Sequence, residues 1–252
     1  MPNGRHCRAM LPCNISQQCV ISAIVCWLIF VGATHSTLAQ GRQTIAPEGY
    51  VDLGGIWDSP ATIPVCWNPS AKPFTEEIEW VQGAVEKYVS GVSSISFRWG
   101  ECSQPAGIEI SVADETPHSN VGRQWKRNAD GSRIQDNSAQ FVQLPTLMTL
   151  NFTFEKSFRT CRSDKEHCIR AIGVHEFLHA VGFLHEQLRD DAPQECKERF
   201  SGNSDFGGFS PEYGTTAYDP DSHMNYCTNI YRKPIKLSGG DLFVLGRFYR
   251  RP

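Results

Sequence analysis

The stretch that decides the fold is His175-Glu176-Phe177-Leu178-His179-Ala180-Val181-Gly182-Phe183-Leu184-His185-Glu186. Residues four apart lie on one face of a helix, so His175 and His179 are expected to point the same way. Gly182 can adopt the left-handed conformation that ends a helix, and the resulting turn would bring His185 to the same point. Three imidazoles with a fourth position open are typical of a catalytic zinc ion, and Glu176 can accept a proton from water there.

The length of this pattern is what makes it specific. The H-E-x-x-H pair alone also occurs by chance in ordinary helices, but the glycine and the third histidine at fixed offsets argue against coincidence. The extended form is the zinc signature of metzincins. Its continuation through Glu186, Gln187 and Arg189 resembles the astacin branch of that class.

A second stretch, Tyr218-Asp219-Pro220-Asp221-Ser222-His223-Met224-Asn225-Tyr226, is similar to the astacin pattern Tyr-Asp-x-x-Ser-x-Met-x-Tyr. This resemblance implies that Met224 forms a tight turn beneath the metal and that Tyr226 is both an extra zinc ligand and an oxyanion donor. A methionine alone would more often be plain core. The family usually has an aliphatic residue at the position of His223, and we expect that histidine not to be a ligand.

The resemblance also implies a fold and an activity. We expect an α+β, metzincin-like fold: a twisted mixed sheet with two long helices, followed by an irregular C-terminal lobe. The catalytic domain would span residues 63–252, with an upper lobe to about residue 184 and a lower lobe over 185–252. The implied activity is that of a zinc-dependent endopeptidase with Glu176 as general base. Its protein or peptide substrate would pair with an edge strand.

Three features limit the comparison with astacins. The terminal cysteine usual in that family is absent, and the segment before the domain lacks the inhibitory Phe-x-Gly-Asp motif. Leu178 also occupies a position that is small in many metzincins. Two other classes therefore stay open: an interaction protein that binds zinc without catalysis, and a zinc hydrolase with a non-peptide substrate.

Composition and the N-terminus indicate an exported globular protein. The chain has 252 residues, of which 40% are hydrophobic, as is ordinary for a globular protein. Its net charge of −3 gives no indication of nucleic-acid binding, which a basic surface would favour. Arg5 and Arg8 precede an apolar run over residues 20–33, which predicts a signal peptide over 1–39 with cleavage after Ala39. Met10 is an alternative start, and an uncleaved anchor is the alternative interpretation. We expect a secreted, extracellular protein without stable membrane insertion after cleavage.

Cysteine usage agrees with export. Of ten cysteines, four fall in the leader, and the six that remain are Cys66, Cys102, Cys161, Cys168, Cys196 and Cys227. An even number in an exported chain predicts disulfides, although six cysteines allow 15 pairings. Cys161 and Cys168 flank the start of the predicted metal-binding helix, and we expect them to pair. Residues 40–62 read as a lead-in or short pro-segment.

Hydrophobic periodicity places the main elements. An apolar stripe predicts a helix over 74–89, and alternating patterns predict strands over 63–67, 95–99, 108–113 and 148–154. Capping-box spacing of Ser163 and Glu166 predicts that the metal-binding helix starts near Asp164. The polar stretch 114–140 reads as a loop or edge region, within which 119–124 resembles the edge strand of astacins. Residues 237–249 resemble their C-terminal helix.

Overall fold

The computed structural model describes residues 49–58, 61–100, 102, 107–200, 202, 212–214, 217–228, 230–231 and 234–251. All of the described residues belong to one compact unit, Ala46–Pro252. The predicted leader and its cleavage position lie outside the described residues. Within the described ranges, no helix is both long and apolar enough to cross a membrane.

A five-stranded sheet carries the fold, with the strand order β3-β2-β4-β8-β5. β3, β2, β4 and β8 are parallel to one another, and the short β5 is antiparallel to β8 at one edge. The five strands are β2 (Thr62–Trp67), β3 (Ser96–Gly100), β4 (Ile108–Val112), β5 (His118–Ser119) and β8 (Thr146–Leu150). Along β4, alternate residues are buried, as expected for a strand with one face on the core. The mixed sheet predicted from the sequence is confirmed.

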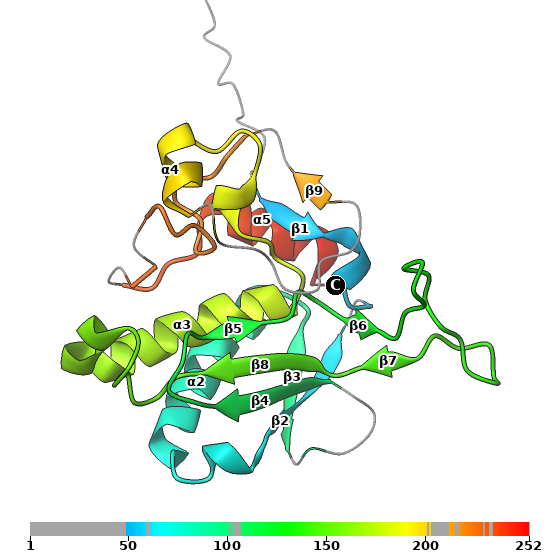
Figure 1. The fold of residues 1–252 in the computed structure, drawn as a ribbon, viewed down its shortest axis with the longest axis horizontal. Coiled ribbons are helices and arrows are strands. Elements are labelled where there is room, and N and C mark those ends of the chain that lie inside the picture. The colour runs from blue at the N-terminus through cyan, green and yellow to red at the C-terminus, as the bar shows by residue number, and fades with distance from the viewer. Residues whose placement is uncertain are drawn as a thin grey trace, which may run out of the picture. The chain divides into compact units, whose positions relative to one another are not determined.

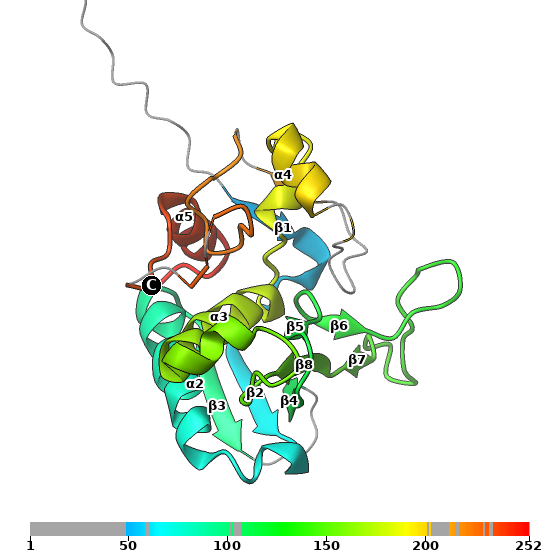
Figure 2. The same cartoon turned by 60° about the vertical axis from the view of Figure 1, so that its left-hand side comes forward.

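Two long helices lie together on one face of this sheet (Figures 1 and 2). They are α2 (Thr75–Tyr88), which connects β2 to β3, and α3 (Lys165–Ala180), which carries the first two histidines of the motif. Phe177 of α3 packs edge-on against Phe97 of β3 with 5.0 Å between ring centroids. Gly173 lets α2 approach closely, because a Cβ there would lie 3.2 Å from Cγ1 of Val81.

Two local expectations are corrected by the structure. β8 ends at Leu150 rather than continuing to residue 154, because the Asn151 side chain accepts hydrogen bonds from the N–H groups of Thr153 and Phe154 and turns the chain. The capping box predicted at the start of α3 is also absent. The N-cap residue Asp164 makes no side-chain cap bond, and a 3₁₀ turn, Arg159–Asp164, leads directly into the helix.

The rest of the described chain consists of short elements joined by loops. Small sheets are formed by β1 (Tyr50–Asp52) with β9 (Glu212–Gly214) and by β6 (Gln124–Trp125) with β7 (Gln143–Leu144). The helices that follow the motif are α4 (Gln194–Arg199) and α5 (Gly239–Phe248). α5 begins with a complete capping box between Ser238 and Asp241. Short 3₁₀ turns occupy Leu53–Gly55, Pro69–Ala71, Ser90–Val92 and Glu186–Leu188.

All six cysteines predicted to lie outside the leader form disulfides. The expected pair Cys161–Cys168 is present and joins the 3₁₀ turn to the first turn of α3. The other two bridges are Cys66–Cys102 and Cys196–Cys227. The last of these ties α4 to the segment just after the predicted methionine turn.

Candidate metal centre

The three histidines of the motif meet at one point. Nε2 of His185 lies 3.3 Å from Nε2 of His175 and 3.0 Å from Nε2 of His179. Three nitrogens bound at 2.0–2.1 Å around a tetrahedral zinc ion would be separated by about 3.3 Å. These two spacings therefore fit zinc, and the ligand atoms of all three side chains lie within 4.8 Å of one another, a group able to hold a metal ion.

The opposite ring nitrogens fix which atoms face the centre. Nδ1 of His175 donates a hydrogen bond to the carbonyl oxygen of His223 at 2.9 Å, and Nδ1 of His179 donates to that of Phe183 at 2.8 Å. The proton of each neutral ring is thus held on Nδ1, so the lone pair of Nε2 points inward. Burial, with three neighbouring imidazoles, holds the pKa of His175 well below its usual value, which favours the neutral form that binds metal.

Gly182 ends α3 as the sequence predicts. Its φ of 106° lies in the left-handed region, and its N–H bonds the carbonyl of His179 while the N–H of Phe183 bonds that of Leu178. These two bonds form the Schellman motif. A Cβ at residue 182 would lie 2.9 Å from Cδ1 of Ile56. The backbone conformation therefore favours glycine here, and any larger residue would also displace the end of the Ile56 side chain.

The last carbonyls of α3 are bound by residues that the sequence patterns did not indicate. Nε1 of Trp57 donates to the carbonyl of Ala180 at 2.9 Å, and the Tyr249 hydroxyl donates to that of Val181 at 2.7 Å. The Tyr249 oxygen also accepts the N–H of Trp57. A helix end carries unsatisfied carbonyls, and these two side chains satisfy them in the buried core. Nothing in the local sequence around Trp57 signals this role.

Residues 50–52 hold the segment between the second and third histidines. The N–H of Asp52 bonds the carbonyl of Gly182, and the N–H of Leu184 bonds that of Tyr50, both at 2.9 Å. Val51 forms an antiparallel bridge with Phe183 and is fully buried. β1 therefore fixes the path of the chain that delivers His185 to the centre.

Glu176 directly follows His175 on α3 and is buried, with 2% of its surface exposed. Its Oε2 atom makes no hydrogen bond within the described part of the chain. Burial raises the pKa of Glu176 to about 8. A divalent cation held by the adjacent histidines would oppose this shift, because an opposite charge favours the carboxylate. The group is thus placed to exchange a proton near neutral pH.

Met224 lies in a tight turn, as the resemblance implied, and is 1% exposed. The N–H of Glu186, directly after the third histidine, bonds the carbonyl of Met224 at 3.1 Å. The turn is held from the other side by Asp241 at the start of α5, whose carboxylate accepts the hydroxyl of Ser222 and the N–H of His223. The turn thereby connects the metal centre to the C-terminal helix.

Tyr226 and His223 take different positions. The Tyr226 ring stacks on that of His175, with centroids 5.1 Å apart, and lies 4.6 Å from that of His185. His223 Nε2 lies 2.9 Å from the carbonyl of Ala171 on α3. The side chain of His223 is therefore not among the three that converge, whereas the ring of Tyr226 borders them.

Glu186 is buried but points away from the three histidines. Its Oε2 accepts the N–H of Asp219 at 3.2 Å and lies 3.5 Å from Nε of Arg189. Burial raises the pKa of Glu186 to about 8, and Arg189 opposes that shift. Through its bond to Asp219, Glu186 stabilises the second motif, residues 218–226.

No protein-family model and no curated protein matches this chain. Among solved structures, the chain is similar to myroilysin with a TM-score of 0.54 and 18% identity, over 81% of this chain and 100% of that one. A hatching enzyme zinc-protease of the medaka fish Oryzias latipes, high choriolytic enzyme 1, gives 0.45 and 16%, over 77% and 93%. The likeness to myroilysin shows a shared fold and agrees with the metzincin-like architecture expected from the sequence.

Proposed function

We propose that this protein is a secreted zinc-dependent endopeptidase of the astacin type. The observation that carries the proposal is the convergence of three imidazoles, with the Nε2 atom of His185 at zinc spacing from those of His175 and His179. A buried carboxylate, Glu176, directly follows the first of them on α3. His175, His179 and His185 would hold the metal, and Tyr226, whose ring borders theirs, would be a further ligand in the resting protein. Zinc bound there would supply a Lewis acid that polarises a carbonyl and lowers the pKa of water.

Side chains of the protein carry out proton transfer, oxyanion stabilisation and positioning. Glu176 accepts a proton from the attacking water and passes it to the leaving amine, for which a pKa near neutrality is suited. The Tyr226 hydroxyl donates a hydrogen bond to the oxyanion that develops on the substrate. Gly182, Glu186 and Met224 are positioning residues, since each contacts the backbone that carries or supports a histidine.

Export is part of the same proposal. Residues 1–39 are a signal peptide, and 63–252 form the catalytic domain after a lead-in over 40–62. Three disulfides support an oxidising, extracellular location. The segment over 49–58 packs against the end of α3, so the mature protein needs at least this part of the lead-in.

An assay on casein with the purified mature protein tests the activity. We expect cleavage that stops with a chelator and returns when zinc is added. Bound zinc without cleavage of casein or of a panel of esters would instead indicate an interaction protein. Hydrolysis of an ester alone would indicate a hydrolase with a non-peptide substrate.

A further inference from the structure

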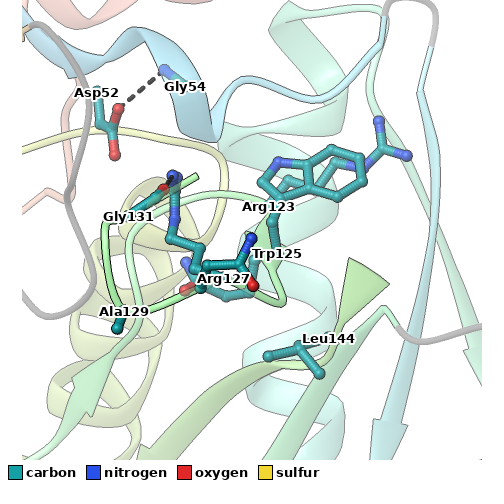
Figure 3. A pocket seen from close by; sticks show the side chains of 10 residues that line it. Asp52, Gly54, Arg123, Trp125, Arg127, Ala129, Gly131 and Leu144 are labelled. Atoms are coloured by element: carbon teal, nitrogen blue, oxygen red, sulfur yellow. Dashed lines mark hydrogen bonds between the residues drawn. The ribbon is translucent and has the colours of Figure 1, made fainter. Parts of the chain in front are cut away.

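A pocket of about 390 Å³ lies beyond the edge of the sheet, between the segment 52–54 and the extension 123–144 that carries β6 and β7 (Figure 3). Its volume is in the range of small-ligand sites. Arg123, Arg127 and Trp125 line it, with Asp52 and Gly54 opposite. None of these residues belongs to the metal centre described above.

Two arginines stack on the indole of Trp125, namely Arg123, which lines the pocket, and Arg133, which is not among the lining residues. The guanidinium carbon of Arg123 lies 4.1 Å from the ring centre of Trp125, and that of Arg133 lies 4.7 Å from it. Arg127 donates from Nη1 to the carbonyl of Gly131 at 2.7 Å, and Arg133 donates from Nη2 to that of Gly54 at 3.1 Å. Such contacts orient the guanidinium groups without neutralising them, as in sites that bind carboxylates.

Two arginines, Arg123 and Arg127, and one carboxylate, that of Asp52, line the pocket, so its lining carries a net positive charge. The extension 123–144 contains four basic and two acidic residues. Both acids, Asp130 and Asp136, accept hydrogen bonds from backbone N–H groups of their own turns. Arg123 pairs with Asp58, but the Asp58 side chain is 92% exposed, so this pair is screened. Burial and the like charges of Arg127 and Arg123 lower the pKa of Arg133, while Asp52 opposes this.

The pocket is joined directly to the metal centre. The N–H of Gly122, one residue before Arg123, bonds the carbonyl of His179 at 2.8 Å. On the opposite wall, the N–H of Asp52 bonds the carbonyl of Gly182. The chain that follows β5 therefore passes the last turn of α3, which carries His179, and leads into the pocket.

We infer that this pocket binds an acidic side chain of the peptide substrate, at a position N-terminal to the cleaved bond. An extended peptide that adds to an edge strand is held by main-chain hydrogen bonds, with side-chain pockets giving specificity. If it pairs antiparallel to β5, its N-terminal part lies at the C-terminal end of the strand, beside Arg123 and Arg127. This inference rests on the proposed peptidase function and adds a substrate preference to it.

Matched peptides that differ only by Glu or Gln test the preference. The mature, zinc-loaded protein would be assayed on a series of such peptide pairs. The position that carries Glu or Gln differs from pair to pair and runs from the fourth residue before the cleaved bond to the third residue after it. We expect kcat/KM to favour Glu about tenfold at one position before the bond, as for a carboxylate bound by partly exposed arginines. The preference should shrink in 1 M salt.

Two variants locate the effect. Arg127→Gln should bring the Glu/Gln ratio close to one. Arg98→Gln removes an exposed charge from β3, at the opposite edge of the sheet, and should leave the ratio unchanged. Equal rates for both peptides, a Glu preference only after the cleaved bond, or a preference that persists in Arg127→Gln would each overturn the inference.

A binding measurement separates this inference from the peptidase proposal. Fluorescein-labelled Glu and Gln peptides would be titrated with Glu176→Gln protein and followed by anisotropy, which needs no turnover. Tighter binding of the Glu peptide than of the Gln peptide supports the pocket, even if casein is not cleaved. This difference should disappear when Arg127→Gln is combined with Glu176→Gln in the same protein. Casein cleavage with no difference between the two peptides would retain the peptidase and reject the pocket.

Discussion

Nδ1 of His175 donates a 2.9 Å hydrogen bond to the backbone carbonyl of His223, 48 residues further along the chain. This bond ties the first histidine of the zinc motif to the residue directly before Met224. The His223 ring contacts the carbonyl of Ala171. The His223 side chain therefore adds no fourth imidazole to the centre. The two motifs are thus built into one site through the backbone of the second.

The three-histidine site predicts how much metal the protein binds and which residues bind it. The purified protein should contain one tightly held zinc ion, and His185→Ala should lose most of it, because only two of the three imidazoles remain. Elemental analysis measures this directly. His118→Ala, on the edge strand β5, is the control and should keep its zinc. Full zinc content in His185→Ala would contradict the assignment of the third ligand.

Glu176→Gln should separate metal binding from catalysis. Glutamine keeps the size of the side chain but cannot accept the proton, so zinc content should be retained while peptide hydrolysis falls by orders of magnitude. Elemental analysis and steady-state kinetics on one peptide substrate provide the two readouts. Hydrolysis near the original rate would show that another group is the base.

Tyr226→Phe deletes only the hydroxyl from a ring that stacks on His175. Loss of one oxyanion donor typically lowers kcat by about 10²–10³, and such an interaction acts on the transition state rather than on substrate binding. We therefore expect KM and zinc content to change little while kcat falls. An unchanged kcat with a lower melting temperature would mean that the hydroxyl serves packing only.

Gly182→Ala should weaken both the fold and the metal site. An alanine with a φ of 106° is strained by about 1–2 kcal/mol, and its Cβ would meet Ile56. Gly131→Ala is a matched control, since Gly131 has a φ of 84° but no heavy atom lies within 4 Å of where its Cβ would stand. Both variants should lower the melting temperature, and only Gly182→Ala should lower zinc affinity. Equal zinc affinity in the two would contradict the role of the turn in placing His185.

Mass spectrometry of the secreted protein tests export and oxidation together. The N-terminus should lie near Gln40, and peptide mapping should recover the pairs Cys66–Cys102, Cys161–Cys168 and Cys196–Cys227 with no free thiol. Three or more reactive thiols in the mature protein would contradict the disulfide assignment. A retained leader would contradict the predicted cleavage after Ala39.

The sequence predicted those elements whose signals are local. Helical periodicity located α2 and α3 within one or two residues, and alternation located β2, β3 and β4. It failed where a side chain competed with the regular pattern, as when Asn151 bound the backbone ahead of it and ended β8. The predicted start of α3 near Asp164 is confirmed, but the capping box inferred from the spacing of Ser163 and Glu166 does not form.

The spacing of the motif by itself determined that His175 and His179 share a helical face and that Gly182 turns the chain toward His185, because helix periodicity and glycine's conformational freedom are local properties. The tertiary structure alone decided which distant groups complete the site. Trp57 and Tyr249 bind the carbonyls at the end of α3, β1 fixes the path to His185, and the His223 carbonyl orients His175. These contacts join residues at least 48 positions apart, and no local pattern specifies them, because any segment with a suitable donor or acceptor could satisfy a buried backbone group.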